Sequence, residues 1–583
     1  MNSLSVSGKS WISKKFNSEE INFFKTNFFL DEIIAKLLSI RKIKKEEVSF
    51  FLEPLIKNIL PNPYILKDMD IAIERTEKAI IRKETVGIFG DYDVDGATST
   101  AVLGKYFELL KISFQIYIPD RKNEGFGPNE KGFSEFIDKG VKLIFTVDCG
   151  TLSYEPMNFA KEKNVDVIIL DHHQSETKLP SAHSIVNPNR FDDNSELNYL
   201  CAAGVCFMFL VALNKRLRDQ SWFINNSIKE PDLMDILDLV SLGTVCDVVP
   251  LVGLNRAIVS QGLKIIKKKN NLGLKTLIEV CNIESSITTH DLGYVLGPRI
   301  NAGGRVGKST HGANLLLNQI PKKTFQLAVD LNSYNKERQI LESELLSKIL
   351  NTNYKNSLDP VIILHGSNWH EGIIGIIAAR VKEKYNKPCI IISVDGDIGK
   401  GSGRSIHGFD LGSTIIGAVQ SGLLTKGGGH KMAAGFTINM NKIKEFKEFV
   451  FRKFTSINVN LGEKNNYYFD AEIAPSAVNV DFFEKINILA PFGSGNPEPR
   501  FVIKDVKLVN SKIVGEKHIK SIFVGSDTTT LKAISFNTVE TELGSYLLKK
   551  NIKPFNIAGK LSLNEWRGQK NVEFIVDDIS VTK

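Results

Sequence analysis

Three short apolar runs, each followed by polar residues, stand in the first third of the chain. They are VGIFGDYDVDG at 86–96, KLIFTVDCG at 142–150 and VDVIILDHH at 165–173. Their apolar residues are rich in β-branched types, which is typical of buried strands. The intervening stretches are long enough for helices, so the pattern predicts an α/β fold with a parallel sheet and helices on both faces. Sites in such sheets form at the carboxyl ends of the strands.

Apolar spacing also predicts the rest of the architecture. Residues 1–80 have helical spacing, and residues 324–350 have leucines mostly three or four apart, which indicates one long helix. VIILHG at 361–366, a helix over 373–385 and CIIISV at 389–394 form a second βαβ unit, and short β-like runs follow residue 458. We expect a helical cap at 1–80, a catalytic α/β domain at 81–322, a linker helix at 323–352, a second α/β domain at 353–457 and an all-β domain at 458–583.

Composition narrows the class of protein. Hydrophobic residues make up 42% of the chain, so every part can bury a core. The net charge of +8 is too small for this length to indicate a nucleic-acid partner by itself. The six cysteines lack the paired spacing of a zinc ribbon or a disulfide framework. The chain begins without a signal-peptide pattern and has no membrane-spanning run, so we expect a cytoplasmic protein with no membrane association.

Acidic and imidazole side chains gather after the apolar runs. They are Asp91, Asp93 and Asp95 after the first, Asp148 after the second, Asp171, His172 and His173 after the third, and Asp247 in the further apolar segment LVSLGTVCDVVPL. A lone Asp after a strand is most often a helix N-cap, but repetition on successive strands favours a shared site. Gathered carboxylates are costly to bury unless a cation neutralises them. Carboxylate and imidazole ligands suit Mn²⁺ or Mg²⁺.

These ligands exceed what one ion needs. Two ions bridged by a carboxylate would use them all and would activate a water for attack on a phosphoryl group. The chain can turn after the third strand, so one of the adjacent histidines can ligate a metal while the other faces a substrate phosphate. We therefore expect phosphoryl hydrolysis at this edge of the sheet.

Two motifs imitate other sites. DYDVDG matches half of a calcium-binding EF-hand loop, but Val102 stands where a bidentate Glu is required and a strand precedes it. AGGRVGKST at 302–310 is close to a nucleotide-binding P-loop, but Ala302 replaces its first glycine and LGPRI before it is a poor strand. Neither motif is accepted.

Further segments offer contacts to phosphates. Arginines among glycines suit bidentate phosphate binding, and a helix start after WHEG offers free amides. The alternatives are a surface turn with incidental arginines and a flexible glycine turn. The candidate substrate-binding residues are Arg299 and Arg305 in GPRINAGGR, His370 in WHEG, Arg404 in GSGRS, and Gly428, Gly429 and His430 in KGGGHKMAAGF.

In this order, GDYDVDG, TVDCG, LDHH and GTVCDVVPL resemble the DHH phosphoesterase family. GPRINAGGR, the WHEGIIGIIAAR, GSGRS and GGGHKMAAGF segments of a DHHA1-type domain, and PFGSGNPEPRF narrow the resemblance to the family's single-strand-specific DNA exonucleases. The recognisable motifs cover about residues 80 to 505. The domain order and the total length agree as well.

This resemblance implies a two-lobed enzyme with a C-terminal oligonucleotide-binding (OB) fold. The enzyme would remove 5′ mononucleotides from single-stranded DNA in the 5′ to 3′ direction, with two Mn²⁺ or Mg²⁺ ions, in recombination and mismatch repair. A single-strand-binding protein and a helicase are the expected partners, and a monomer is the expected state. The implied metal ligands are Asp91, Asp93, Asp148, His172 and Asp247, with His173 on the scissile phosphate and Asp95 as a further catalytic residue.

One position departs from the wider family. Many members have a histidine four residues before the first Asp, where this chain has Gly87, so water would replace one ligand. Two other functions compete with DNA cleavage: hydrolysis of a small substrate such as pyrophosphate, a cyclic dinucleotide or short RNA, and a catalytically silent scaffold. The roughly 125 residues after Asn458 favour a long substrate over a small one, and the complete ligand set argues against a scaffold.

Overall fold

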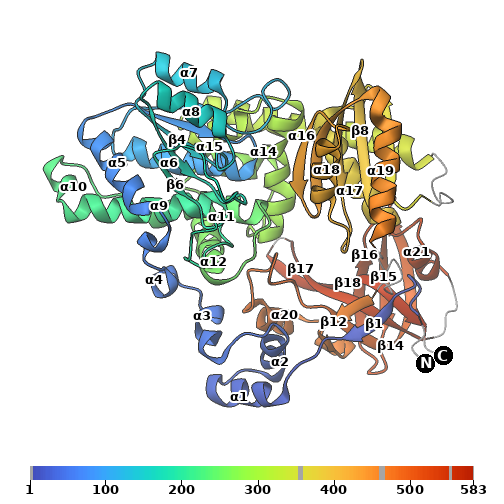
Figure 1. Ribbon diagram of the computed structural model, residues 1–583. Helices are drawn as coiled ribbons and strands as arrows, with labels where there is room; N and C mark the ends of the chain where they lie inside the picture. Colours follow the sequence, from blue (N-terminus) through green and yellow to red (C-terminus); the bar gives the residue numbers. More distant parts are fainter. Residues whose placement is uncertain (1–3, 352–358, 458–465, 550–553, 567, 582–583) are drawn as a thin grey trace.

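The computed structural model describes residues 4–351, 359–457, 466–549, 554–566 and 568–581. Its main elements form three sheets with their helices, which occupy the left, upper right and lower right of Figure 1. This arrangement is the expected one of two α/β parts and a C-terminal β part.

The first sheet has five parallel strands in the order β3-β2-β4-β5-β6. The strands are β2 (Val86–Gly90), β3 (Phe114–Tyr117), β4 (Leu143–Val147), β5 (Asp166–Leu170) and β6 (Ser184–Val186). The chain runs from β2 to one side and then returns to build β4, β5 and β6 on the other. The order therefore reverses between β2 and β4, where open α/β sheets form binding crevices.

Helices cover both faces of this sheet. Alternating strand residues face opposite layers, so Ile88 joins the larger core while Phe89 packs edge-on against Phe133 at 5.8 Å. The covering helices include α5 (Met69–Ile81), α6 (Val94–Leu109), α9 (Ala202–Asp219) and α11 (Leu237–Cys246) on one side, and α7 (Glu130–Asp138) and α8 (Tyr154–Glu162) on the other.

A long helix, α16 (Pro321–Asn351), joins the two α/β parts. Leu327 and Leu331 pack into the first core, whereas Leu345 and Ile349 pack into the second. The second sheet has the order β10-β11-β9-β8-β7, with β7 and β8 parallel and the others antiparallel. Its elements are β7 (Ile362–Ser367), α17 (Glu371–Tyr385), β8 (Cys389–Asp395), β9 (Ile398–Arg404), α18 (Leu411–Gln420), β10 (Lys426–His430), β11 (Ala433–Asn439) and α19 (Ile443–Ser456).

The C-terminal sheet closes on itself. Its order is β13-β14-β15-β16-β18-β17, and β14 also pairs with β17, so the strands form a small barrel of the OB type. The strands are β13 (Ala471–Glu472), β14 (Phe501–Val514), β15 (His518–Val524), β16 (Thr530–Ser535), β17 (Phe555–Trp566) and β18 (Gln569–Val581). The other helices are α3 (Val48–Leu52), α4 (Ile56–Ile59), α10 (Trp222–Asn225), α12 (Gly253–Lys268), α13 (Leu272–Val280), α14 (Gly297–Val306), α15 (His311–Leu317), α20 (Val480–Asn487) and α21 (Glu542–Leu547).

The first 80 residues are not all helical. They contain α1 (Ser18–Phe28) and α2 (Glu32–Ile40), but also β1 (Ser10–Ser13), which pairs in parallel with β12 (Asn466–Phe469). Trp11 donates to Asp578 at 2.9 Å, and the Val6 amide donates to the Ile579 carbonyl. The start of the described chain is therefore part of the C-terminal barrel region.

The boundaries expected after residues 352 and 457 fall at or in 352–358 and 458–465, which lie outside the described residues. Among the helices of the described ranges, none combines the length and the apolar character needed to cross a lipid bilayer.

Candidate metal centre and nucleic-acid cleft

Three strand ends deliver side chains to the switch point of the first sheet. Asp91 and Asp93 follow β2, Asp148 follows β4, and His172 lies two residues after β5. The N-cap interpretation also holds for Asp93, because its Oδ1 accepts from the Gly96 amide at 3.0 Å at the start of α6. The cap fixes this carboxylate beside the others.

Two further aspartates come from helices. Asp247 is the C-cap of α11, so it reaches the site from a helix end rather than from a strand. Asp95 lies in the first turn of α6, and its carboxylate accepts from the amides of Ala202 (2.6 Å) and Ala203 (3.0 Å) at the start of α9. Asp95 therefore holds two helices together at the edge of the cluster.

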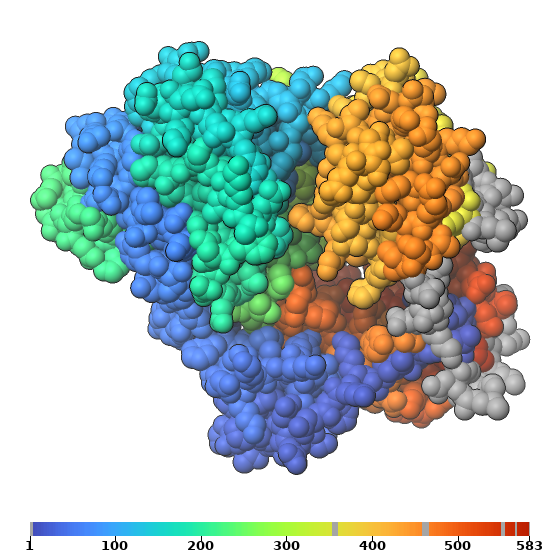
Figure 2. Space-filling model, in the orientation of Figure 1, coloured from blue at the N-terminus to red at the C-terminus, as the bar shows by residue number. Residues whose placement is uncertain are grey.

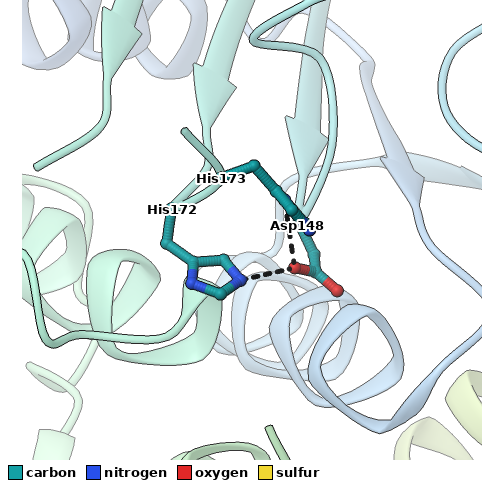
Figure 3. A group of neighbouring side chains, drawn as sticks. All are labelled: Asp148, His172 and His173. Atoms are coloured by element: carbon teal, nitrogen blue, oxygen red, sulfur yellow. Dashed lines mark ion pairs between the residues drawn. The ribbon is translucent and has the colours of Figure 1, made fainter. Parts of the chain in front are cut away.

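His172 lies at the centre of these carboxylates. Its Nε2 is 3.3 Å from Oδ1 of Asp148, 3.6 Å from Oδ2 of Asp247 and 3.8 Å from Oδ2 of Asp95. Figure 3 shows the His172 ring directed at Asp148, with His173 following it in the chain. The ring is thus placed to share a cation with its acidic neighbours.

The potential ligand atoms form three overlapping groups. Within each group all ligand atoms lie within 4.8 Å of one another. The groups are Asp91, Asp93 and Asp148; Asp148, His172 and His173; and Asp95, His172 and Asp247. Asp148 and His172 each belong to two groups, so the three groups share ligand atoms and lie side by side.

The electrostatics of the cluster favour a cation. Burial and then the charge of Asp93 raise the pKa values of Asp91 and Asp148 well above the usual range. Burial, with Asp95 nearby, raises the pKa of Asp247 to about 8. One buried oxygen of Asp91 and one of Asp247 lack a hydrogen-bond partner among the described residues. This set of oxygen and nitrogen donors fits Mn²⁺ or Mg²⁺.

Asp171, which belongs to the expected acidic cluster but was assigned no role from the sequence, fixes His173. Its Oδ1 contacts Nδ1 of His173 at 2.8 Å and accepts from the backbone amides of both histidines, while its Oδ2 accepts from the Thr151 amide. Burial alone would lower the pKa of His173, but the Asp171 carboxylate outweighs it and raises this pKa to about 9. The imidazole is therefore held as a cation beside the acidic cluster.

Three arginines converge next to this centre. Arg305, near the end of α14, donates to the Gly372 carbonyl at 3.1 Å, and Arg404 ends β9. Burial, followed by the positive charges of Arg121, Arg338 and Arg404, lowers the pKa of Arg305 to about 10. Among the described residues, no carboxylate lies within ion-pair distance of Arg121, Arg305 or Arg404. Arginines close enough to lower one another's pKa values suit an anion that accepts hydrogen bonds from several of them.

A loop between β3 and α7 also borders the centre and was missed from the sequence. Arg121 lies over the Tyr92 ring at 5.1 Å, and the Phe126 ring is 5.7 Å from that of His173. Phe126 is 57% exposed. It stands between Gly125 and Gly127, which both have positive φ. An exposed aromatic between two glycines, as in DRKNEGFGPN, is the signal that could have identified this loop.

The other expected contacts are dispersed. Arg299 donates to Asn332 and to the Val295 carbonyl. The Nδ1 of His370 accepts from the Gly372 amide and caps α17. Gly428, Gly429 and His430 lie on β10, an exposed edge strand rather than a flexible turn. Figure 2 shows a recess between the first α/β part (blue to green) and the second (yellow to orange), the two parts that Arg305 joins.

Comparison with known proteins agrees with this architecture. Family models match the N-terminal domain of the DHH family at residues 85–244, the DHHA1 domain at 358–456 and the RecJ OB domain at 469–578.

Similar proteins span most of the chain. The single-stranded-DNA-specific exonuclease RecJ of Dickeya dadantii is 33% identical over 87% of this chain and 89% of its own length. That of Escherichia coli is 32% identical over 94% and 96%, respectively. The crystal structure of Thermus thermophilus RecJ in complex with Mn²⁺ superimposes with a TM-score of 0.81 at 25% identity, covering 99% of this chain and 80% of that one. The chain belongs to the RecJ family of single-stranded-DNA-specific exonucleases.

Proposed function

We propose that this protein is a metal-dependent exonuclease that degrades single-stranded DNA from its 5′ end and releases mononucleotides. The observation that carries the proposal is the set of three overlapping donor groups that share Asp148 and His172, next to a cluster of arginines. The related RecJ proteins act on single-stranded DNA, and the Thermus thermophilus RecJ structure holds Mn²⁺.

We assign two cation positions to the donor groups. Asp91, Asp93 and Asp148 would hold one ion, and His172 and Asp247, which form a donor group with Asp95, would hold the second. When bound, two such ions supply a water of lowered pKa and neutralise charge on the attacked phosphoryl group. Burial disfavours ionised Asp91 and Asp148 in the metal-free protein, so binding would release protons from them.

His173 is assigned to the scissile phosphate. Its Nδ1 is engaged by Asp171, so Nε2 is the nitrogen free to donate to a phosphoryl oxygen. The charge that Asp171 stabilises strengthens this hydrogen bond and neutralises part of the phosphate charge. Asp95 contributes by holding α6 and α9 and by its charge near His172.

The arginine cluster is assigned to the phosphates at the 5′ end of the strand. Arg305 follows Gly304, which packs against the backbone and ring of Tyr92, between Asp91 and Asp93. A terminal phosphate held by Arg121, Arg305 and Arg404 would therefore lie beside the metal centre. Arg299, His370 and the β10 residues Gly428, Gly429 and His430 would contact the strand further away.

The remaining parts suit a single strand. Exposed Phe126 offers a stacking surface at the centre, and the barrel is of a type that binds oligonucleotides. We assign the enzyme to recombination and repair in the cytoplasm, acting as a monomer with a single-strand-binding protein and a helicase. The division into a cap, two α/β domains, a linker helix and a barrel, at the boundaries given above, is part of this proposal.

The test uses single-stranded DNA labelled at either end. Incubation with Mn²⁺ or Mg²⁺ should release the 5′ label at once as a mononucleotide and shorten the 3′-labelled strand progressively, while EDTA and blunt duplex abolish cleavage. Asp93→Ala should be inactive, and Asp138→Ala, which alters an exposed aspartate at the end of α7, should keep full activity. Early release of the 3′ label would contradict the polarity, and hydrolysis of pyrophosphate or a dinucleotide alone would contradict the substrate.

A further inference from the structure

Asp247 differs from its neighbours in how it is held. Asp93, Asp95 and Asp171 accept hydrogen bonds from backbone amides, which fix their carboxylates. Oδ2 of Asp247 has no hydrogen-bond partner among the described residues. Nε2 of His172 lies 3.6 Å from this oxygen, and the backbone at the end of α11 and in the loop after it sets where the carboxylate lies.

That backbone is strained. Val248, directly after Asp247, has φ +61°, a left-handed conformation that is rare for a β-branched residue. Such a conformation costs about 1–2 kcal/mol and persists only where the surroundings impose it. The Val248 side chain is 69% exposed, so its own packing does not impose it. The conformation follows the end of α11, where the Val248 amide donates to the Val245 carbonyl at 3.2 Å, and contacts further along the chain hold the path that the backbone takes from there.

The backbone at Pro250 and Leu251 contacts residues 489–497, which precede most of the barrel strands. The Leu251 amide donates to the Ser494 carbonyl at 2.8 Å. A Cβ at Gly493 would lie 2.8 Å from Cδ1 of Leu251, and a Cβ at Gly495 would lie 3.0 Å from Cβ of Pro250. Gly495 also has φ +73°. These contacts explain why PFGSGNPEPRF has glycine at both 493 and 495, although neither residue belongs to the metal centre.

The same residues are fastened to the first α/β part at other points. Arg256 of α12 is only 2% exposed and donates to the carbonyls of Leu489, Ala490 and Pro491. Thr289 donates to the Phe492 carbonyl at 2.6 Å. Within residues 489–497, the Asn496 amide group donates to the carbonyls of Leu489 and Pro491. Residues 489–497 are thus held against α12 and Thr289 as well as against Pro250 and Leu251, in the loop that follows Asp247.

We infer that residues 489–497 are the positioning element for Asp247, setting the second cation position through Pro250 and Leu251. The inference rests on the proposed function, because it concerns a ligand of the proposed metal centre. It means that the C-terminal part shapes the metal centre as well as binding the strand. Outer partners that orient metal ligands typically contribute about 10- to 100-fold to metal affinity.

The test compares two glycine substitutions. Gly495→Ala and Gly515→Ala both place a Cβ on a left-handed residue, at φ +73° and +57°. Only the first meets Pro250, whereas the Cβ at Gly515 has ordinary contact with His518. Mn²⁺ binding to the metal-free full-length proteins is measured by calorimetry, and hydrogen exchange is followed at residues 247–251.

Gly495→Ala should weaken the binding of one Mn²⁺ by about tenfold or more and speed exchange at residues 247–251, while Gly515→Ala matches the wild type in both. Thr289→Val, which removes only the hydrogen bond to Phe492, should weaken the same ion by about two- to tenfold, so a folding defect in Gly495→Ala leaves the test intact. Wild-type Mn²⁺ affinity in both variants would overturn the inference.

The experiments distinguish a failure of the proposed function from a failure of the inference about residues 489–497. If the wild type binds no Mn²⁺, or if Asp93→Ala still cleaves DNA, both proposals are overturned. If the wild type binds Mn²⁺ and cleaves DNA, and Gly495→Ala binds Mn²⁺ equally well, only the inference about residues 489–497 is lost.

Discussion

The adjacent histidines have opposite electrostatic surroundings. Burial lowers the pKa of His172, so it is neutral and can ligate a metal through Nε2, which faces three carboxylates. Asp171 keeps His173 protonated. Two neighbouring residues of the same type can therefore perform different tasks, because one points into the acidic cluster and the other is held by the carboxylate that precedes them.

Asp171→Asn should shift the alkaline limit of the reaction. His173 stays protonated up to about pH 9 because of Asp171, and removing this charge should move its pKa towards the ordinary value of about 6.5. With saturating Mg²⁺, kcat should then begin to fall at least about one pH unit lower than in the wild type. Asp192→Asn, which removes a carboxylate paired with Arg190 near the surface, is the control. An unchanged profile would show that His173 does not act as a cation.

Asp247→Asn should reveal a pH-dependent instability of the metal-free protein. The folded protein holds a proton on Asp247 up to about pH 8, whereas the unfolded chain releases it near pH 4, so this group's contribution to stability is lost as pH rises between these values. In EDTA the variant should therefore gain stability relative to the wild type as pH rises. The gain should be at most about 1.4 kcal/mol per pH unit, and partial exposure of the carboxylate should keep it below this limit. Urea unfolding at pH 5, 6.5 and 8 measures this. A difference independent of pH would refute it.

At the scale of elements, the spacing and the types of apolar residues predicted the strands β2, β4 and β5 and the helix α16. These elements bury continuous or regularly spaced apolar faces, so local sequence suffices to define them. The donors at the strand ends follow from the parallel sheet. The helix origin of Asp247, the amide partners of Asp95 and the pairing of β1 with β12 depend on contacts between distant segments, which leave no local pattern.

The start of α17 is predicted to set the fit between the two α/β parts. A Cβ at Gly372 would lie 2.3 Å from the Arg305 carbonyl, so Gly372→Ala must separate α17 from α14. Displacement of the arginine cluster should then lower kcat/KM on single-stranded DNA by up to about 100-fold.

Gly417→Ala in α18 is the matched control, because its Cβ meets only Phe449 at an ordinary 3.6 Å. Both rates are measured at saturating Mn²⁺ with the same labelled strand. Equal kcat/KM in the two variants would mean that α17 and α14 tolerate separation.

At the scale of the whole molecule, the parts interlock. Residues 489–497 bind Arg256 and Thr289 of the first α/β part, and Arg41 of the helices before it donates to Asn496. In Figure 1 the C-terminal β part lies beneath the second α/β part, and the helices α1 to α4 lie beneath the first. The barrel is therefore not an appendage that can be removed without effect on the rest.

Truncation after residue 457 should destabilise what remains. Arg256 would lose its carbonyl partners at 489–491, and a hydrogen bond from a charged donor contributes about 1.5–3 kcal/mol. Scanning calorimetry should show a lower Tm for the first α/β part in the truncated chain than in the full chain. Cleavage of a dinucleotide should decline together with cleavage of long strands. A truncated chain with an unaltered Tm would contradict this interlocking.

The pairing of β1 with β12 also affects the order in which parts of the chain can fold during synthesis. Ser10 meets Asn466, a partner made about 450 residues later, which takes a ribosome roughly 20 to 90 seconds at 5–20 residues per second. During that interval the first α/β part can fold, whereas β1, which precedes it, has no partner strand to pair with. Residues 10–13 are thus made long before their partner strand, and the growing chain must keep them accessible until the barrel is synthesised.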